Sequence, residues 1–159
     1  MIFDNIKSEL EVNQFEITCM DSSRPWGDFF VIYELRDQKF TNTYLEVLNV
    51  SGFKISDKLS PKKSVMAPGK RYSWQFHHRR AEIWRVIQVE AGVQRSPKDT
   101  ESELEILNVD YTIISQQGER HGLIGLDDYV VIAEISQHID ADNPSYEDDI
   151  VGVQDDFGR

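Results

Sequence analysis

Four residues have the types and the spacing of metal ligands, and three of them lie close together in the chain: Gln75, His77 and Glu82. An extended chain places Gln75 and His77 on one face, because alternate residues of a strand point the same way. Two antiparallel strands joined by the polar turn 78–80 would bring Glu82 to that face too. An amide oxygen, an imidazole nitrogen and a carboxylate supply three quarters of a transition-metal site. His121 is the candidate for the fourth ligand.

Short extended segments must position these residues. Apolar and polar residues alternate in runs of four to eight, with turn residues between them, and helical periodicity is almost absent. We therefore expect an all-β barrel or sandwich. The expected strands are 15–20, 28–35, 43–50, 53–59, 62–67, 72–77, 82–89, 104–109, 111–114 and 129–135, with a short amphipathic helix at 4–12 and a loop at 94–103.

The ligand spacing resembles the first cupin motif, which runs from a glycine to two metal-binding histidines and a glutamate. Here the motif begins at Gly69 and has Gln75 in the first ligand position, a variation found in phosphomannose isomerases. The segment from Gly118 to His121 resembles the second cupin motif. The resemblance implies a double-stranded β-helix, the jelly-roll barrel of the cupins.

A longer resemblance, over residues 24–159, is to the cupin domain of type II mannose-6-phosphate isomerases. The matching segments are 24–27, 68–84, His121, 147–150 and 155–159. We therefore expect one cupin domain over 24–159 with an acidic C-terminal tail, preceded by an N-terminal arm over 1–23. The resemblance implies an aldose–ketose isomerase of a phosphorylated sugar that uses one divalent metal ion. The four ligand types suit zinc, iron, cobalt, nickel or manganese, and the resemblance favours zinc.

The resemblance also assigns roles to four further residues. Arg80 matches the family's arginine before the ligand glutamate, and Lys62 and Lys63 match its Lys-Arg pair. Arg80 and one of these two lysines are therefore expected near the phosphate. Glu134 matches the acid of a late strand and is the candidate base. Isomerisation moves a proton between neighbouring carbons, which requires a base on one face of the sugar and cations that hold the phosphate.

Five positions depart from the family pattern. Ile83 replaces a histidine, but strand parity turns it away from the metal. Gly122 and Gly152 replace arginines, Gly125 replaces an asparagine, and Val89 replaces the glycine that closes the first motif. The metal site is therefore expected to be kept and the substrate site to be altered. Two alternatives stay open: a non-catalytic, metal-retaining cupin that binds a sugar or regulates, and an oxidative metal cupin.

The composition excludes other classes of function. A net charge of −11 argues against nucleic acid as a partner, although residues 62–85 are locally basic. No apolar run approaches the roughly 18 residues of a membrane helix, so no membrane partner is expected. Cys19 is the single cysteine, which fits a reducing compartment. The N-terminus has no apolar signal region, and we expect a cytoplasmic protein.

The outer side of the ligand strand predicts a homodimer. If Gln75 and His77 point into the barrel, the three aromatic residues Tyr72, Trp74 and Phe76 point out of it. An uncovered apolar patch of this kind is unusual on a soluble monomer. Either a second copy or the N-terminal arm should cover it.

Overall fold

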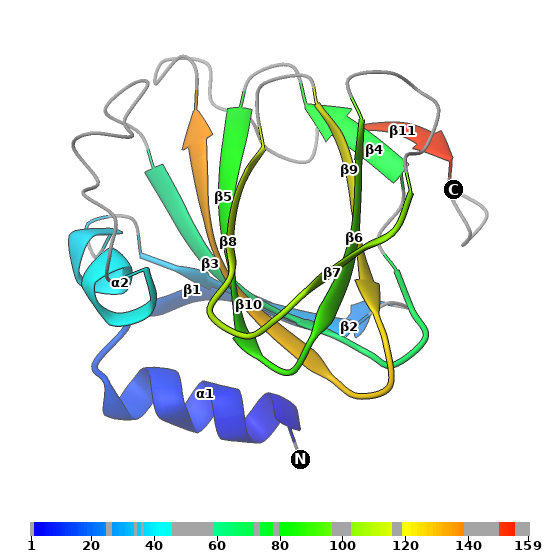
Figure 1. The fold of residues 1–159 in the computed structure, drawn as a ribbon. Helices are drawn as coiled ribbons and strands as arrows, with labels where there is room; N and C mark the ends of the chain where they lie inside the picture. Colours follow the sequence, from blue (N-terminus) through cyan, green and yellow to red (C-terminus); the bar gives the residue numbers. More distant parts are fainter. Residues whose placement is uncertain are drawn as a thin grey trace.

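Two antiparallel sheets face each other and form the barrel of this computed structural model (Figure 1). The structure describes residues 2–24, 27–33, 35, 37–45, 59–71, 74–77, 80–96, 103–115, 119–138 and 150–154. The first sheet has the order β1 (Ile17–Arg24), β2 (Gly27–Ile32), β3 (Leu59–Met66), β10 (Val130–His138), β5 (Arg80–Gln88) and β8 (Thr112–Ser115). The second has the order β11 (Ile150–Gln154), β4 (Trp74–His77), β9 (Arg120–Gly125), β6 (Ala91–Ser96) and β7 (Glu105–Leu107).

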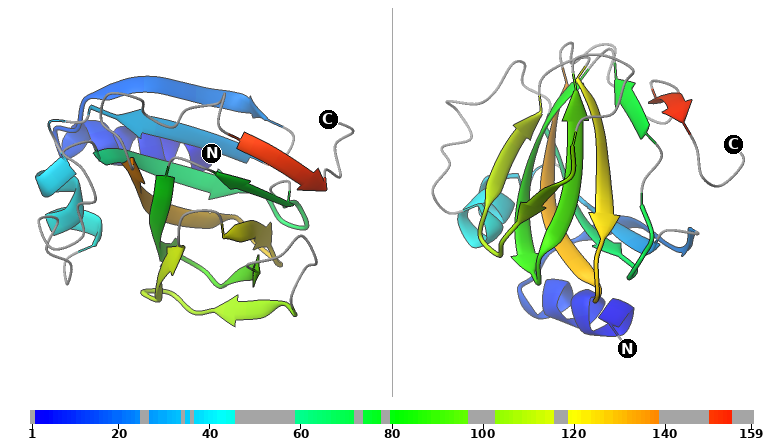
Figure 2. Two further views of the ribbon diagram at one scale, coloured as in Figure 1. Left: turned by 90° about the horizontal axis from the view of Figure 1, so that it is seen from above. Right: turned by 45° about the vertical axis from the view of Figure 1, so that its right-hand side comes forward.

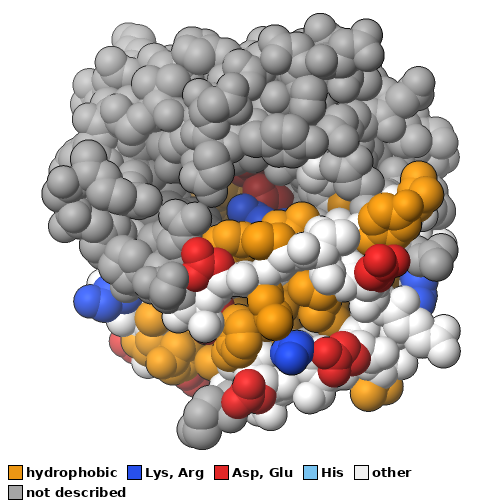
Figure 3. Space-filling model, turned by 180° about the vertical axis from the view of Figure 1, so that it is seen from behind, with side chains coloured by type: hydrophobic (Ala, Val, Ile, Leu, Met, Phe, Trp, Pro, Cys, Tyr) orange, Lys and Arg blue, Asp and Glu red, His pale blue; other side chains and the backbone are white. Residues whose placement is uncertain are grey.

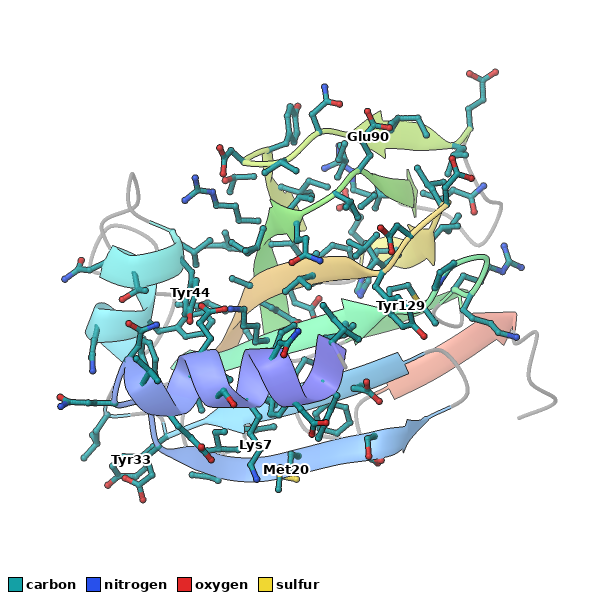
Figure 4. All side chains as sticks on the ribbon, turned by 90° about the horizontal axis from the view of Figure 1, so that it is seen from below. Lys7, Met20, Tyr33, Tyr44, Glu90 and Tyr129 are labelled. Carbon is teal, nitrogen blue, oxygen red and sulfur yellow. The ribbon has the colours of Figure 1, made fainter. Side chains whose placement is uncertain are left out.

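Two helices cover the outside of the six-stranded sheet: α1 (Ile2–Val12) and α2 (Asp37–Tyr44). Seen from below, α1 lies across that sheet, and Tyr44 at the end of α2 lies close to it (Figure 4). Both helices bury apolar side chains against the outward-facing residues of β2, β3 and β10. The resulting outer core contains Ile6, Leu10, Phe15, Phe30, Ile32, Phe40, Tyr44, Leu45, Val65, Val131, Ala133 and Ile135.

A second core fills the barrel itself. It gathers the inward-facing side chains of both sheets: Met66, Trp84, Val86, Ala91, Val93, Leu107, Ile113, Leu123, Val130 and Ile132. Towards the other end of the barrel the inward-facing residues become polar. Ser60, Ser136 and Glu82 lie in one register row, and Lys62, Glu134 and Trp84 lie in the next. This polar end is the upper end in Figure 1, where β5 begins and β10 finishes.

Most of the expected elements are confirmed, and so is the all-β class. The helix expected at 4–12 is α1, and the strand expected at 15–20 is β1. Because β1 pairs with β2 through residue 24, part of the expected arm belongs to the six-stranded sheet. The segment 46–58, which holds most of two expected strands, lies outside the described residues.

Three sequence predictions about the elements were wrong. Residues 43–44 end the helix α2 rather than begin a strand, and 94–96 continue the strand β6 rather than a loop. β4 and β5 do not form a hairpin, because β4 pairs with β9 and β11 whereas β5 pairs with β10 and β8. The chain crosses between the sheets after His77, so the two ligand-bearing strands face each other across the barrel (Figure 2). Sandwiched sheets bring their inner faces together in this way.

The described part of the surface carries charges of both signs. On the face seen from behind, hydrophobic side chains gather between acidic and basic ones (Figure 3). Of the helices that the structure describes, neither is long and apolar enough to cross a membrane.

Candidate metal centre

Glu82 and His121 meet inside the barrel from opposite sheets. Glu82 lies on β5 and His121 on β9, and each is only 3% exposed. The His121 Nε2 atom lies 3.5 Å from the Glu82 Oε2 atom. The convergence that the motif spacing predicted for these two residues is therefore present in the fold.

The hydrogen bond on the other side of the His121 ring identifies its tautomer. His121 Nδ1 lies 3.1 Å from the backbone oxygen of Glu119. A carbonyl oxygen can only accept, so Nδ1 must carry the proton. In the neutral ring, Nε2 then presents a lone pair to the Glu82 carboxylate, and two acceptors face each other. A proton shared between the two groups or a cation near both atoms would stabilise such an arrangement.

The spacing of these two acceptors fits a metal ion. Nitrogen and oxygen ligands lie about 2.0–2.1 Å from zinc in a tetrahedral site, which puts neighbouring ligand atoms roughly 3.3 Å apart. The observed 3.5 Å is close to this separation. The carbonyl that holds Nδ1 is also the kind of second partner that orients metal-binding histidines. Glu82 and His121 thus fit as two of the predicted ligands.

Trp84 fixes the geometry of both residues. Its indole Nε1 donates a hydrogen bond of 2.9 Å to the Glu82 Oε2 atom. Its ring also contacts the His121 imidazole edge to face, with 5.2 Å between centroids and an interplanar angle of 84°. Because Trp84 is buried, neither contact competes with solvent. The sequence offered a signal for this contact, since Trp84 lies two residues after Glu82 and so shares its strand face.

The side chains of Gln75 and His77 lie outside the described residues. Their backbone belongs to β4, and Gln75 stands directly opposite His121 in the pairing of β4 with β9. Among the side chains that are described, no group of three His, Cys, Asp or Glu residues could hold a metal ion. The third and fourth ligands therefore stay predictions.

Lys62 and Glu134 form an ion pair next to the candidate metal centre. The Lys62 Nζ atom lies 3.3 Å from the Glu134 Oε2 atom, and the Glu134 side chain is only 3% exposed. Lys62, Glu134 and Trp84 are directly opposite one another on β3, β10 and β5. This register brings the candidate base onto the face that carries Glu82, and it brings Lys62 with it.

Lys63 lies on the other side of the six-stranded sheet. Its fully buried side chain pairs with Glu9 of α1 at 3.0 Å and lies 4.1 Å from the centre of the Tyr44 ring. Burial lowers the pKa of Lys63, and the Glu9 carboxylate opposes that shift. The structure therefore corrects the pairing of Lys62 with Lys63, because adjacent residues of a strand point to opposite faces. Lys63 belongs to the outer core.

The other predicted substrate residues are placed only in part. Arg80 begins β5, two residues before Glu82, and its side chain lies outside the described residues. Close packing explains why position 125 is a glycine, because a Cβ atom there would lie 2.1 Å from the Ala67 carbonyl oxygen. An asparagine at this position would clash with the backbone. Ile83 faces the outer core by register with Ile135, as strand parity predicted.

Comparisons with known proteins agree with this architecture. The capsular polysaccharide assembling protein CapF from Staphylococcus aureus is 14% identical and superposes with a TM-score of 0.55, over 86% of this chain and 34% of CapF. A recombinant oxalate oxidase in complex with glycolate is 20% identical, with a TM-score of 0.53, over 84% of this chain and 58% of the oxidase. A cupin 2 conserved barrel domain protein from Salinispora arenicola is also similar, at 18% identity and a TM-score of 0.44, over 53% of this chain and 65% of that one.

The chain has a cupin fold. No protein-family model matches the sequence, and a search of curated proteins finds no match. The chain spans only part of the length of CapF and of the oxalate oxidase, and at these identities the likeness shows the fold alone. The specific resemblance to mannose-6-phosphate isomerases therefore stays a prediction.

Proposed function

We propose that this cupin is a metal-dependent aldose–ketose isomerase of a phosphorylated sugar, similar to the mannose-6-phosphate isomerases. The observation that carries the proposal is the pair of facing acceptors on Glu82 and His121, 3.5 Å apart in a buried site. Glu82, His121, Gln75 and His77 would hold one divalent ion, and zinc suits the nitrogen and oxygen ligands. Such an ion would act as a Lewis acid on the oxygens of the sugar.

Glu134 is suited to move the proton. Lys62 lies 3.3 Å from its carboxylate and favours the ionised form, which is the form that accepts a proton. Because Glu134 is almost fully buried, a sugar next to it would be shielded from water. The carboxylate would take the proton from one carbon and return it to the neighbouring carbon, while a second proton passes from the hydroxyl oxygen of the aldose to its carbonyl oxygen. Lys62 would hold Glu134 in place.

A second function is a non-catalytic, metal-retaining cupin that binds a sugar. One observation favours it. The Lys62 ammonium pairs with one carboxylate oxygen of Glu134, and this ion pair makes the carboxylate a weaker base. Glu134→Gln separates the two functions. An isomerase loses turnover and still binds the sugar phosphate, whereas a binding protein has no turnover to lose.

Metal analysis of the purified full chain tests the proposal, together with assays on a panel of hexose and pentose phosphates. We expect one metal ion per chain and loss of that ion in the His77→Ala, His121→Ala double variant, with the circular dichroism spectrum kept. Cys19→Ser is the matched control, since it removes an exposed thiol that could bind zinc adventitiously. Stoichiometric metal in the double variant would show that the ligand assignment is wrong.

A further inference from the structure

Arg95 lies on the same inner face as His121. The two residues are directly opposite each other on β6 and β9, so their Cβ atoms are neighbours at about 4.5–5.5 Å. The sequence prediction missed Arg95, because it placed the residue in a loop. The Arg95 side chain is 29% exposed and pairs with Glu105 at 3.4 Å.

Among the residues whose side chains the structure describes, the basic ones on the inner face of the barrel are Lys62 and Arg95. They differ in their acidic partners. The partner of Lys62 is Glu134, which is buried. One partner of Arg95 is Glu105, which is half exposed at the edge strand β7. A surface ion pair of this kind contributes little, so an incoming anion can replace Glu105 at small cost.

We propose that Arg95 binds the phosphate of the sugar substrate, which rests on the proposed function and adds a specificity residue to it. A guanidinium presents two parallel N–H donors and binds a phosphate through both. Arg95 reaches the polar end of the barrel from the five-stranded sheet, whereas Lys62 comes from the six-stranded sheet. The phosphate would therefore bind on the His121 side of the barrel interior and leave Lys62 with Glu134. Arg95 would supply a cation that Gly122 and Gly152 do not.

Calorimetric titration of the metal-loaded full chain with inorganic phosphate and with mannose 6-phosphate tests the inference. Arg95→Gln should weaken both affinities by roughly tenfold or more, the loss typical of a hydrogen-bonded charge. The matched control is Lys7→Gln, which removes the same charge from an exposed position on α1. It should leave both affinities unchanged, since it alters only the long-range field.

Two further variants keep the test decisive. Glu105→Gln removes the competing carboxylate and should tighten phosphate binding. Arg95→Lys keeps the positive charge but lacks the two parallel N–H donors of the guanidinium. Its affinity for phosphate should therefore fall between those of wild type and Arg95→Gln. If Arg95→Gln does not fold, Arg95→Lys serves as the test variant in its place. Unchanged phosphate affinity in both Arg95 variants would overturn the inference, as would a wild-type chain that binds neither anion.

Failure of the isomerase proposal gives a different pattern. If no sugar phosphate is turned over and Arg95→Gln still weakens phosphate binding, the phosphate site stands and the protein is a binding cupin. If sugar phosphates are turned over with an unchanged Michaelis constant in Arg95→Gln, the isomerase stands and another residue binds the phosphate. Metal content, measured on every variant, separates both cases from loss of the metal centre.

Discussion

At the scale of single residues, the candidate metal centre depends on contacts behind its ligands. Trp84 donates to the same Glu82 oxygen that faces His121, and its ring packs against the imidazole. These two contacts restrict both ligands to one arrangement before any ion arrives. Second partners of this kind commonly change metal affinity by 10–100-fold.

Trp84→Phe should therefore lower the affinity for zinc by about tenfold, because the phenyl ring stays aromatic but loses the N–H donor. Competition with a chromophoric chelator measures the affinity, and thermal unfolding of the metal-free chain measures the stability. A change in stability without a change in zinc affinity would make Trp84 a core residue only. Val130→Ala, which alters a fully buried residue at the apolar end of the inner core, is the control for packing.

Lys63 makes a prediction about pH. Its folded-state pKa lies below the ordinary value of 10.5 because the side chain is buried. Between those two values the unfolded chain holds a proton that the folded chain has released, so stability rises with pH. The Lys63→Met variant lacks this pH-dependent contribution to stability. The unfolding free energy of wild type minus that of the variant should therefore grow between pH 7 and about 9.5, below the range in which tyrosines ionise.

Urea unfolding at both pH values checks this difference. Tyr44 is present in both proteins, and burial together with its hydrogen bond to Glu9 raises its pKa, so it cancels in the comparison. Lys7→Met is the control for the loss of a helix-side lysine that is exposed. A difference that stays constant or shrinks with rising pH would mean that Lys63 is not desolvated in the folded state.

At the scale of elements, the turn between β5 and β6 has a left-handed backbone conformation at a residue that is not glycine. Val89, at the position of the family's motif glycine, has a φ of 56°. A β-branched residue rarely adopts this left-handed conformation, which costs about 1–3 kcal/mol. The turn between β5 and β6 thus has a backbone conformation that suits glycine, although a valine occupies it.

Val89→Gly should raise the free energy of unfolding by about 1 kcal/mol, because relief of strain exceeds the added freedom of the unfolded chain. Chemical denaturation measures the change. Val109→Gly is the matched control, since Val109 lies in a turn and its φ is not positive, and we expect it to destabilise the protein. If Val89→Gly destabilises as well, the packing of Val89 against the inner core outweighs the strain.

At the scale of the whole molecule, the two sheets are covered differently. The outer face of the six-stranded sheet is buried by α1 and α2. On the outer face of the five-stranded sheet, Leu104, Ile124 and Leu126 approach the space above Gly92. Leu104 and Ile106 stay about half exposed there. The N-terminal helix therefore covers the opposite sheet from the one that carries β4.

We expect a homodimer through this outer face, which includes the strand that carries Gln75 and His77. Trp74→Glu should shift the chain from dimer to monomer in light scattering at micromolar concentration, with the bound metal kept. Met20→Glu adds the same charge at an exposed position of the six-stranded sheet and should leave the dimer intact. A wild-type monomer would contradict the prediction.

Alternation in the sequence predicts most of the strands, and the motif resemblance predicts the jelly-roll fold and the meeting of Glu82 with His121. Alternation fixes which residues share a face, and motif spacing fixes which faces carry ligands. Lys62 and Lys63 were expected together, although neighbours on a strand point to opposite sides. The tertiary structure decided what lies on each side: Glu134 beside Lys62, and Glu9 of α1 beside Lys63, 54 residues apart in the chain. The sequence missed Arg95 because strand pairing, which joins distant segments, places it opposite His121.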